Sequence, residues 1–344
     1  MADGVQAALP ARPPGARARL GLATGIVPLV VLALLAGVPF VAAEYLQDLV
    51  VKILILGIFA LSLELLVGTT GLVSLGHAAF LGIGAYATVL ASPPDAAGSL
   101  PLLLALAMGS AALYALFVGA LSLRTRGVYF IMVTLAFAQM AYFVVHDTKV
   151  GGGSDGIYLY FRPALDGVVD LKNRTAFYYL VLGALAATYG LLAVLLRSRF
   201  GHALVGIRIN EQRMRAAGFR TYGYKLAAFV IAGALAGLAG FLIAVRDGFV
   251  NPEMLSWHES GAVLLMLILG GLGHLRGAVL GAVAFTLLKE FYASQGLVGA
   301  LADHWQLTLG LTIIAFVALL PQGLIGLPAQ LRRRPRLSVV VDDE

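Results

Sequence analysis

Apolar blocks alternate with short polar or basic segments along most of the chain. Each block has about 20 residues, the length that an α-helix needs to cross about 30 Å of hydrocarbon, and none shows the alternation of barrel strands. We therefore predict an all-α polytopic membrane protein. The pattern places about ten transmembrane helices, at 20–41, 46–67, 72–91, 101–123, 128–146, 176–196, 224–245, 259–272, 278–293 and 305–320.

Composition supports the same class. Hydrophobic residues make up 60% of the 344 residues and charged residues 12%, and the mean hydropathy is +0.90. A soluble globule cannot keep that much apolar surface out of water, so lipid must be the solvent. The expected organisation is a terminal segment at 1–19, a membrane domain at 20–320 and a tail at 321–344.

Basic residues indicate the orientation, because loops on the cytoplasmic side retain Lys and Arg. An even number of spans places both ends on one side, and most of the 24 basic residues then fall on that side. Both termini are thus predicted to be cytoplasmic. A cleavable signal peptide at the N-terminus is the competing interpretation, but its apolar core would be unusually long. The residues predicted inside are Arg12, Arg17, Arg19, Arg124, Arg126, Arg197, Arg199, Arg208, Arg213, Arg215, Arg220, Lys225, Arg276, Arg332, Arg333, Arg334 and Arg336.

Two glycine-containing interruptions suggest broken or re-entrant helices that line a cavity. One comprises residues 68–71 and the other residues 270–273, and irregular backbone at membrane depth is tolerated where it faces protein or a cavity. Close helix packing is the alternative, and we favour it for the GxxxG pairs Gly233/Gly237 and Gly277/Gly281. Five spans on each side of a long outer loop at 147–175 are compatible with an inverted repeat.

The most unusual polar segment is the predicted cytoplasmic loop at 197–225. Residues 203–217 can form a short helix, and Gly218 is its expected stop. Two interpretations stay open from the pattern: a basic helix lying on anionic lipid, and a docking helix for a cytoplasmic partner.

This segment resembles the cytoplasmic coupling helix of branched-chain amino acid ABC transporter permeases of the LivM type. Ile209 departs from the family pattern, which usually has Asp at that position. The stretches at 71–86, 124–137, 151–157 and 270–282 carry the same resemblance, although His274 and Arg276 differ from the family there. The residues that match the coupling pattern, and that the resemblance assigns to ATPase coupling, are Ile207, Arg208, Asn210, Glu211, Ala216 and Gly218.

The resemblance implies the permease subunit of an ATP-driven importer in the bacterial cytoplasmic membrane. It further implies a second permease subunit of the LivH type or a second copy, two cytoplasmic ATPase subunits that hold ATP and Mg, and an external binding protein that delivers Leu, Ile or Val. This protein would dock on 147–175 and 246–258. Related permeases carry urea, amides or other amino acids, so the substrate is open.

Polar side chains inside the predicted spans are the candidates for a substrate path, because burying them in lipid is costly. The alternative is a structural hydrogen bond to a neighbouring helix, which we favour for His77 and Glu64. The path candidates are Ser74, His77, Tyr86, Gln139 and Glu64.

The sequence lacks the motifs of nucleotide binding, metal binding and hydrolysis. The sequence has no phosphate-binding GxxxxGK[ST] loop, no HExxH or other metal-ligand cluster, and no GxSxG elbow, so we expect neither an enzyme nor a bound cofactor or metal in this chain. The net charge of +6 reports topology, not nucleic acid. An ion-coupled secondary transporter is the alternative function, but it needs midplane carboxylates, and Glu64 is the one serious candidate.

Overall fold

The computed structural model describes residues 31–40, 42–165, 169–171, 173–294, 304–320 and 322–327. The chain divides into two compact units, residues 1–47 and 48–344. In the first unit, the described part is a helix at Val31–Phe40 followed by the start of α2. The amide of Gln47 donates to the carbonyls of Pro39 and Ala42, at 3.2 and 3.0 Å, and ties this turn together. The remainder of the predicted span 20–41, the segment 1–19 and the tail beyond residue 327 lie outside the described residues.

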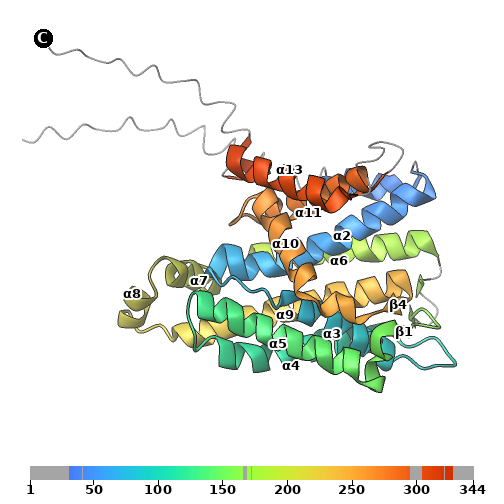
Figure 1. The fold of residues 1–344 in the computed structure, drawn as a ribbon, viewed down its shortest axis with the longest axis horizontal. Helices are drawn as coiled ribbons and strands as arrows, with labels where there is room; N and C mark the ends of the chain where they lie inside the picture. The colour runs from blue at the N-terminus through green and yellow to red at the C-terminus, as the bar shows by residue number, and fades with distance from the viewer. Residues whose placement is uncertain are drawn as a thin grey trace, which may run out of the picture. The chain divides into compact units, whose positions relative to one another are not determined.

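The structure confirms the all-α polytopic class, with helices in nearly all predicted spans (Figure 1). The strands among the described residues have two residues each and form two antiparallel pairs. The elements are α2 Glu44–Glu64, η1 Leu65–Thr70, α3 His77–Leu90, α4 Leu100–Ser122, α5 Val128–Asp147, η2 Lys149–Gly151, η3 Gly153–Asp155, β1 Ile157–Tyr158, β2 Ala164–Leu165, β3 Val169–Asp170, α6 Arg174–Arg197, α7 Arg199–Ile209, α8 Glu211–Ala216, α9 Thr221–Asp247, β4 Phe249–Val250, η4 Pro252–Leu255, α10 Trp257–Gly270, α11 Leu275–Ala293, α13 Trp305–Leu319 and η6 Leu324–Gly326.

Fewer helices than the expected ten are long enough to cross a bilayer. Among the described residues, 6 helices pass by length and composition, or up to 7 if α10 and α11 count as one span. Helices α3 and α10 have 14 residues each, so at 1.5 Å per residue they are about 21 Å long. Residues 72–76, expected to be helical, form an irregular stretch that precedes α3.

Both glycine-containing interruptions are real breaks. Helix α2 ends in the π-helix η1 and then in irregular backbone at Gly71, which has φ +75°. Helices α10 and α11 meet at an angle of 114° across the turn 271–274. Each break therefore frees backbone groups from the helical hydrogen-bond ladder, and those groups need partners from elsewhere in the chain.

Small residues bring α4 and α9 into close contact. Gly237 lies against Ala111 and Ala107, where an added Cβ would be 2.6 Å from the Cβ of Ala111. Gly233 lies against Ala115 in the same way. In lipid, helix association depends on such close packing, not on the hydrophobic effect. The packing interpretation of these glycines thus holds, and the same applies to Gly277/Gly281, which face α10.

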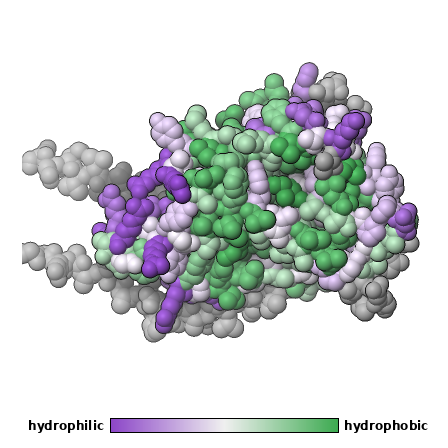
Figure 2. All heavy atoms as spheres, turned by 90° about the horizontal axis from the view of Figure 1, so that it is seen from below, coloured by the Kyte–Doolittle hydropathy of each residue, from purple (hydrophilic) through white to green (hydrophobic). Residues whose placement is uncertain are grey.

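A space-filling view shows apolar side chains over the middle of the face and polar ones gathered toward its ends (Figure 2). Helix α5 is typical of this face, since Phe130, Thr134 and Ala138 are its buried residues while Tyr129, Met132 and Val144 are well exposed. A helix with so much exposed apolar surface needs lipid or another membrane chain around it.

The two ends of the helices differ in structure. Helices α7 and α8 lie at one end, and β1 and β4 lie at the opposite end (Figure 1). Strand β1 pairs antiparallel with β4, with Ile157 opposite Val250, so the loop before α6 is joined to the chain after α9. The two halves of an inverted repeat stay a prediction.

Candidate functional site

The segment at 197–225 forms two helices and not the single helix expected at 203–217. Asn210 interrupts the helix with extended backbone, φ −156° and ψ 96°, and its side chain accepts a hydrogen bond from the amide of Arg213 at 2.9 Å. Asn is among the best N-cap residues, because its side chain satisfies an amide that has no helical partner. The cap ends α7 and starts α8, so it fixes the direction in which α8 leaves.

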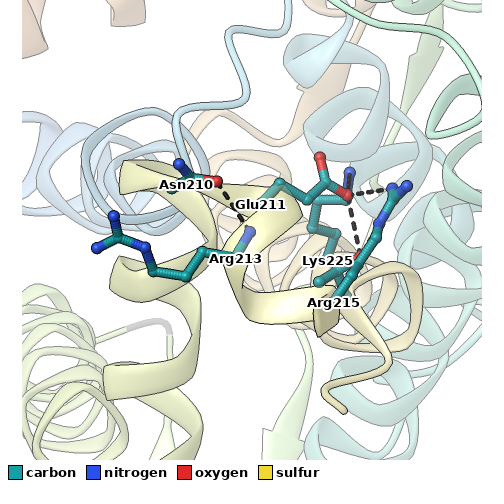
Figure 3. A network of polar contacts seen from close by, with 6 residues as sticks. Asn210, Glu211, Arg213, Arg215 and Lys225 are labelled. Carbon is teal, nitrogen blue, oxygen red and sulfur yellow. Dashed lines mark hydrogen bonds and ion pairs between the residues drawn. The ribbon is translucent and has the colours of Figure 1, made fainter. Parts of the chain in front are cut away.

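Glu211, the first residue of α8, is the centre of a polar network (Figure 3). Its Oε1 accepts from Arg215 Nη2 at 2.6 Å, from Thr221 Oγ1 at 2.9 Å and from Lys225 Nζ at 2.9 Å. Arg215 Nε in turn donates to Thr221 Oγ1 at 3.0 Å. One carboxylate oxygen thereby joins α8 to the first turns of α9.

The network keeps Glu211 ionised. Burial raises the pKa of this carboxyl, but the hydrogen bonds from Lys225, Arg215 and Thr221 lower it further, to about 2. Lys225 is largely buried, with its side chain 8% exposed, and Glu211 is its ion-pair partner. Removing Glu211 would therefore be costly, because it would leave Lys225 buried without this counter-ion.

Helix α8 ends at Ala216, and Gly218 follows it as the expected stop. The amide of Gly218 donates to the carbonyl of Arg215, and the amide of Phe219 to the carbonyl of Met214. Gly218 has φ +87°. These two bonds and the left-handed glycine are the Schellman motif, a common helix stop.

Helix α7 is attached to the membrane part of the fold by one face. Ala203, Leu204 and Ile207 are buried, and the guanidinium of Arg208 donates through Nη1 to the carbonyl of Gly68 in η1. Ile209 points outward, 77% exposed. The six residues assigned to coupling thus divide in two: Ile207, Arg208, Asn210 and Glu211 make contacts that shape the segment, whereas Ala216 and Gly218 are exposed at its outer end.

Sequence reasoning did not single out Lys225, Thr221 and Arg215 as members of one site. Arg215 carries a detectable signal, because residues four apart on a helix are neighbours, and an acid N-terminal to a base at this spacing is favourable. Lys225 and Thr221 lie on another helix, so their contacts with Glu211 could not be predicted from sequence spacing and are known only from the folded structure.

The candidate path residues do not form one cluster. Ser74 lies in the irregular stretch before α3, His77 is the first residue of α3 and Tyr86 lies further along it. Gln139 lies on α5 and Glu64 at the end of α2. No described contact joins Gln139 to the others, and their role in a substrate path stays a prediction.

His77 is buried completely between α2 and α3. Ser62 Oγ donates to the carbonyl of Phe59 at 2.7 Å, so His77 Nε2 donates to Ser62 Oγ at 2.8 Å. The imidazole also stacks on Phe59, with ring centroids 5.4 Å apart. These contacts are those of a residue that fastens two helices together, the alternative we favoured.

Glu64 makes a hydrogen bond of the same kind, to a distant part of the chain. Its Oε1 accepts from the amide of Gly273, in the turn between α10 and α11, at 2.7 Å. Its Oε2 is buried and has no hydrogen-bond partner among the described residues. The hydroxyl of Tyr86 is likewise buried without such a partner.

The turn between α10 and α11 also borders a pocket of about 530 Å³. None of the five candidate path residues lines it. Within the described residues, no group of three or more His, Asp or Glu side chains has the arrangement of a metal site. The lining residues are Ile268, Gly271, Leu272, His274, Gln322, Gly323, Ile325 and Gly326.

Comparison with known families decides the class of this membrane protein. A model of the branched-chain amino acid transport system permease component matches residues 45–318. The chain belongs to this family. As a member it is a transport component and not an enzyme, and the predicted resemblance is confirmed.

Individual relatives agree with the family assignment. LivM of Salmonella typhimurium, a high-affinity branched-chain amino acid transport system permease protein, is 31% identical over 325 residues, which are 88% of this chain and 73% of that protein. BraD of Pseudomonas aeruginosa, with the same description, is 23% identical over 196 residues, 56% of this chain and 61% of that protein. LsrC of Photorhabdus laumondii, an autoinducer 2 import system permease protein, is 31% identical over 102 residues, 28% of this chain and 31% of that protein. No solved structure matches the chain.

Proposed function

We propose that this chain is the membrane-spanning subunit of an ATP-driven importer, and that α7 and α8 receive the motion of a cytoplasmic ATPase. The observation that carries the proposal is the Glu211 network, in which one oxygen accepts from Arg215, Thr221 and Lys225. It braces a short, exposed helix rigidly against α9, a helix of 27 residues. A docking element needs this combination, because force applied to α8 must reach the membrane helices without being lost in a flexible loop.

The proposed substrates are branched-chain amino acids. Support comes from LivM and BraD, which are branched-chain amino acid permease proteins and match more of this chain than LsrC does. LsrC, which matches a shorter stretch, is named for autoinducer 2 import. Urea, amides and other amino acids are therefore substrates that a competition assay must include. Selectivity in such an importer rests mainly on the binding protein that delivers the substrate.

The proposed partners are a LivH-like second permease or a second copy of this chain, two ATPase subunits that hold ATP and Mg, membrane lipid and an external binding protein. The exposed apolar faces of α4 and α5 suit lipid or another permease chain. The two segments proposed for the binding protein, 147–175 and 246–258, are joined by the β1–β4 pair. Tyr158 and Tyr160 are exposed in the first of them, and exposed tyrosines are typical anchors of protein interfaces.

We propose that both chain ends face the cytoplasm of a bacterial inner membrane. Basic residues Arg124, Arg197, Arg199 and Arg213 are exposed at or near the end of the fold that carries α7 and α8, which fits the retention of Arg and Lys on that side.

An ion-coupled secondary transporter is the competing function. It would use Glu64 to bind the ion, and the buried, unpartnered Oε2 of Glu64 is the one observation in its favour. The contact between Glu64 Oε1 and Gly273 argues for a structural role of the same carboxylate.

The deciding experiment measures uptake of radiolabelled L-leucine into proteoliposomes that contain the complex co-purified with its partner subunits. We expect uptake that requires internal ATP and the external binding protein, and that survives an uncoupler. Unlabelled isoleucine, valine, urea and an amide are the competitors. Uptake that collapses with the uncoupler and ignores ATP would replace the importer with the secondary transporter.

A further inference from the structure

The π-helix η1 lies between two polar contacts that come from opposite directions. On one side, Arg208 of α7 donates to the carbonyl of Gly68. This carbonyl belongs to the last turn before the break at Gly71, where helical carbonyls have no amide partner within the helix. A cation at that position is also favourable because the C-terminal end of a helix carries partial negative charge. Arg208 therefore caps the end of the α2–η1 helix from outside.

On the other side, Glu64 reaches the turn between α10 and α11. The amide of Gly273 donates to its Oε1 at 2.7 Å, just before α11 begins at Leu275. The N-terminal end of a helix carries partial positive charge, which favours a carboxylate there. Because Glu64 is 1% exposed, this bond forms in a setting where losing it leaves polar groups unsatisfied.

Gly68 accepts the first of these hydrogen bonds and leaves space for the side chain that accepts the second. It lies four residues after Glu64, and a side chain at this position would overlap the carboxylate, since an added Cβ would meet Oε1, Cδ and Oε2 of Glu64. Its missing side chain makes room for Glu64, while its carbonyl holds Arg208. Gly68 and Glu64, one turn apart in the chain, thus connect α7 to the α10–α11 turn through two hydrogen bonds.

Helix α10, which leads into this turn, is connected near its other end to the start of α3. Ser260 of α10 accepts a hydrogen bond from the amide of Ala78 at 2.9 Å, in the first turn of α3 beside the path candidates Ser74 and His77. Both partners are buried. This hydrogen bond places α10 in direct contact with the segment where the substrate path was predicted.

We propose that Glu64 is a positioning residue, which with Gly68 and Arg208 transmits the movement of the docking helices α7 and α8 to the α10–α11 turn. The carboxylate acts through its Oε1 as a hydrogen-bond acceptor for Gly273, not as an ion site or a substrate ligand. This inference rests on the proposed function, because it takes α7 and α8 as the elements that an ATPase moves.

The test is the number of leucine molecules transported per ATP hydrolysed by the reconstituted complex. Glu64→Met keeps the length of the side chain but removes the acceptor, and we expect it to lower this ratio about threefold to tenfold. Glu64→Gln keeps an oxygen acceptor, so it should retain the wild-type ratio of leucine transported to ATP hydrolysed. An ion-binding or purely charge-based role would instead make Glu64→Gln as defective as Glu64→Met, and that result would overturn the proposal.

A second pair of variants keeps the test independent of how well Glu64→Met folds. Gly68→Ala places a methyl group against the carboxylate and should lower the ratio by itself. In a Glu64→Ala background the same methyl has space, so Gly68→Ala should add no further loss. Additive losses in this double-mutant cycle would contradict the relay.

The same measurements separate the relay from the function on which it rests. If the wild-type complex shows no ATP-dependent uptake, the importer and the relay both fail. If the wild-type complex transports with ATP and Glu64→Met keeps the wild-type ratio, the relay alone fails.

Discussion

At the residue scale, Glu211 is the side chain on which the docking segment depends. Three donors, from Arg215, Thr221 and Lys225, share its Oε1. Lys225 has its side chain 8% exposed, which leaves it little access to water as a substitute partner. The stability of the segment is therefore expected to depend more on this one carboxylate than on the many exposed arginines around it, because exposed ion pairs contribute little.

We predict that Glu211→Ala lowers the free energy of unfolding by roughly 1–3 kcal/mol, because it leaves Lys225 buried without its acceptor. Thermal unfolding of the detergent-solubilised permease measures this loss. Lys225→Met in the Glu211→Ala background should recover part of the loss, since it removes the unpaired charge. Gln212→Ala, at an exposed neighbouring position, is the matched control and should leave the melting temperature unchanged.

The effect of pH follows from the same carboxylate. Its pKa of about 2 in the folded chain lies below the ordinary value of 4.5, so its contribution to stability is full above pH 4.5 and is lost as the pH falls toward 2. Between pH 5 and 8, the contribution of Glu211 to the free energy of unfolding should therefore be constant. The wild type and Glu211→Gln should show pH profiles of the same shape in this range. A step in this range that disappears in Glu211→Gln would contradict the network.

Sequence reasoning reached part of this site and missed the rest for a physical reason. Gly218 was predicted as a helix stop because glycine favours that position, and Asn210 and Glu211 were assigned to coupling through the family resemblance, without their capping and pairing roles. The partner of Glu64 is Gly273, 209 residues away, and a backbone amide leaves no mark in a sequence. The intramembrane carboxylate was recognised, but its partner required the fold.

At the element scale, the break between α7 and α8 is the main departure from the expected single helix. The apolar and charged positions on both sides of Asn210 fit one helical period, and that periodicity cannot reveal a cap inside the run. The side chain of Asn210 competes with the helix by bonding the amide of Arg213, as Asn does at helix starts. The α2–η1 and α10–α11 breaks were detectable because glycines mark them.

Gly218 gives a prediction about α8 as an element. With φ +87° and no atom within 4 Å of an added Cβ, a side chain there meets backbone strain and not a clash, at a cost of roughly 1–3 kcal/mol. Gly218→Val should tilt α8 and reduce leucine transported per ATP, while Gly218→Asn should stay near wild type, since Asn tolerates left-handed backbone.

The matched control for this prediction is Gly223→Val, on α9. Gly223 also has open space around its Cβ position, but its φ is not positive. We expect this variant to transport normally. Equal losses in Gly218→Val and Gly223→Val would show that bulk, and not backbone conformation, is the cause.

At the scale of the whole molecule, the β1–β4 pair joins the two segments, 147–175 and 246–258, that are proposed to bind the external binding protein, called the delivery protein below. This arrangement changes which residues are useful to test. Arg162 Nη2 donates to the carbonyl of Arg246 at 3.5 Å and its Nη1 to that of Leu171 at 3.3 Å, so charge reversal there would disturb the fold as well as any docking. Lys172, another basic residue of the segment 147–175, lies outside the described residues, so the structure does not show whether it can serve as a probe.

Tyr160 is a better probe of docking, because it is 77% exposed and has no described side-chain partner. We predict that Tyr160→Ala weakens binding of the delivery protein about tenfold, as loss of an aromatic anchor does. Titration of the binding protein against nanodisc-embedded permease measures this. Tyr129→Ala, which removes a tyrosine that is 74% exposed on α5, is the control, and an equal effect there would count against a specific docking surface.

Helix α9 links the two ends of the fold that carry these sites. Its 27 residues extend about 40 Å, from Thr221 and Lys225, which hold Glu211, to Asp247, directly before β4. In the proposed importer, we expect this continuous helix to couple the two ends energetically. Thermodynamic reciprocity then gives a consequence for binding. If the external binding protein raises the affinity of the permease for the ATPase by some factor, the ATPase must raise its affinity for the binding protein by the same factor.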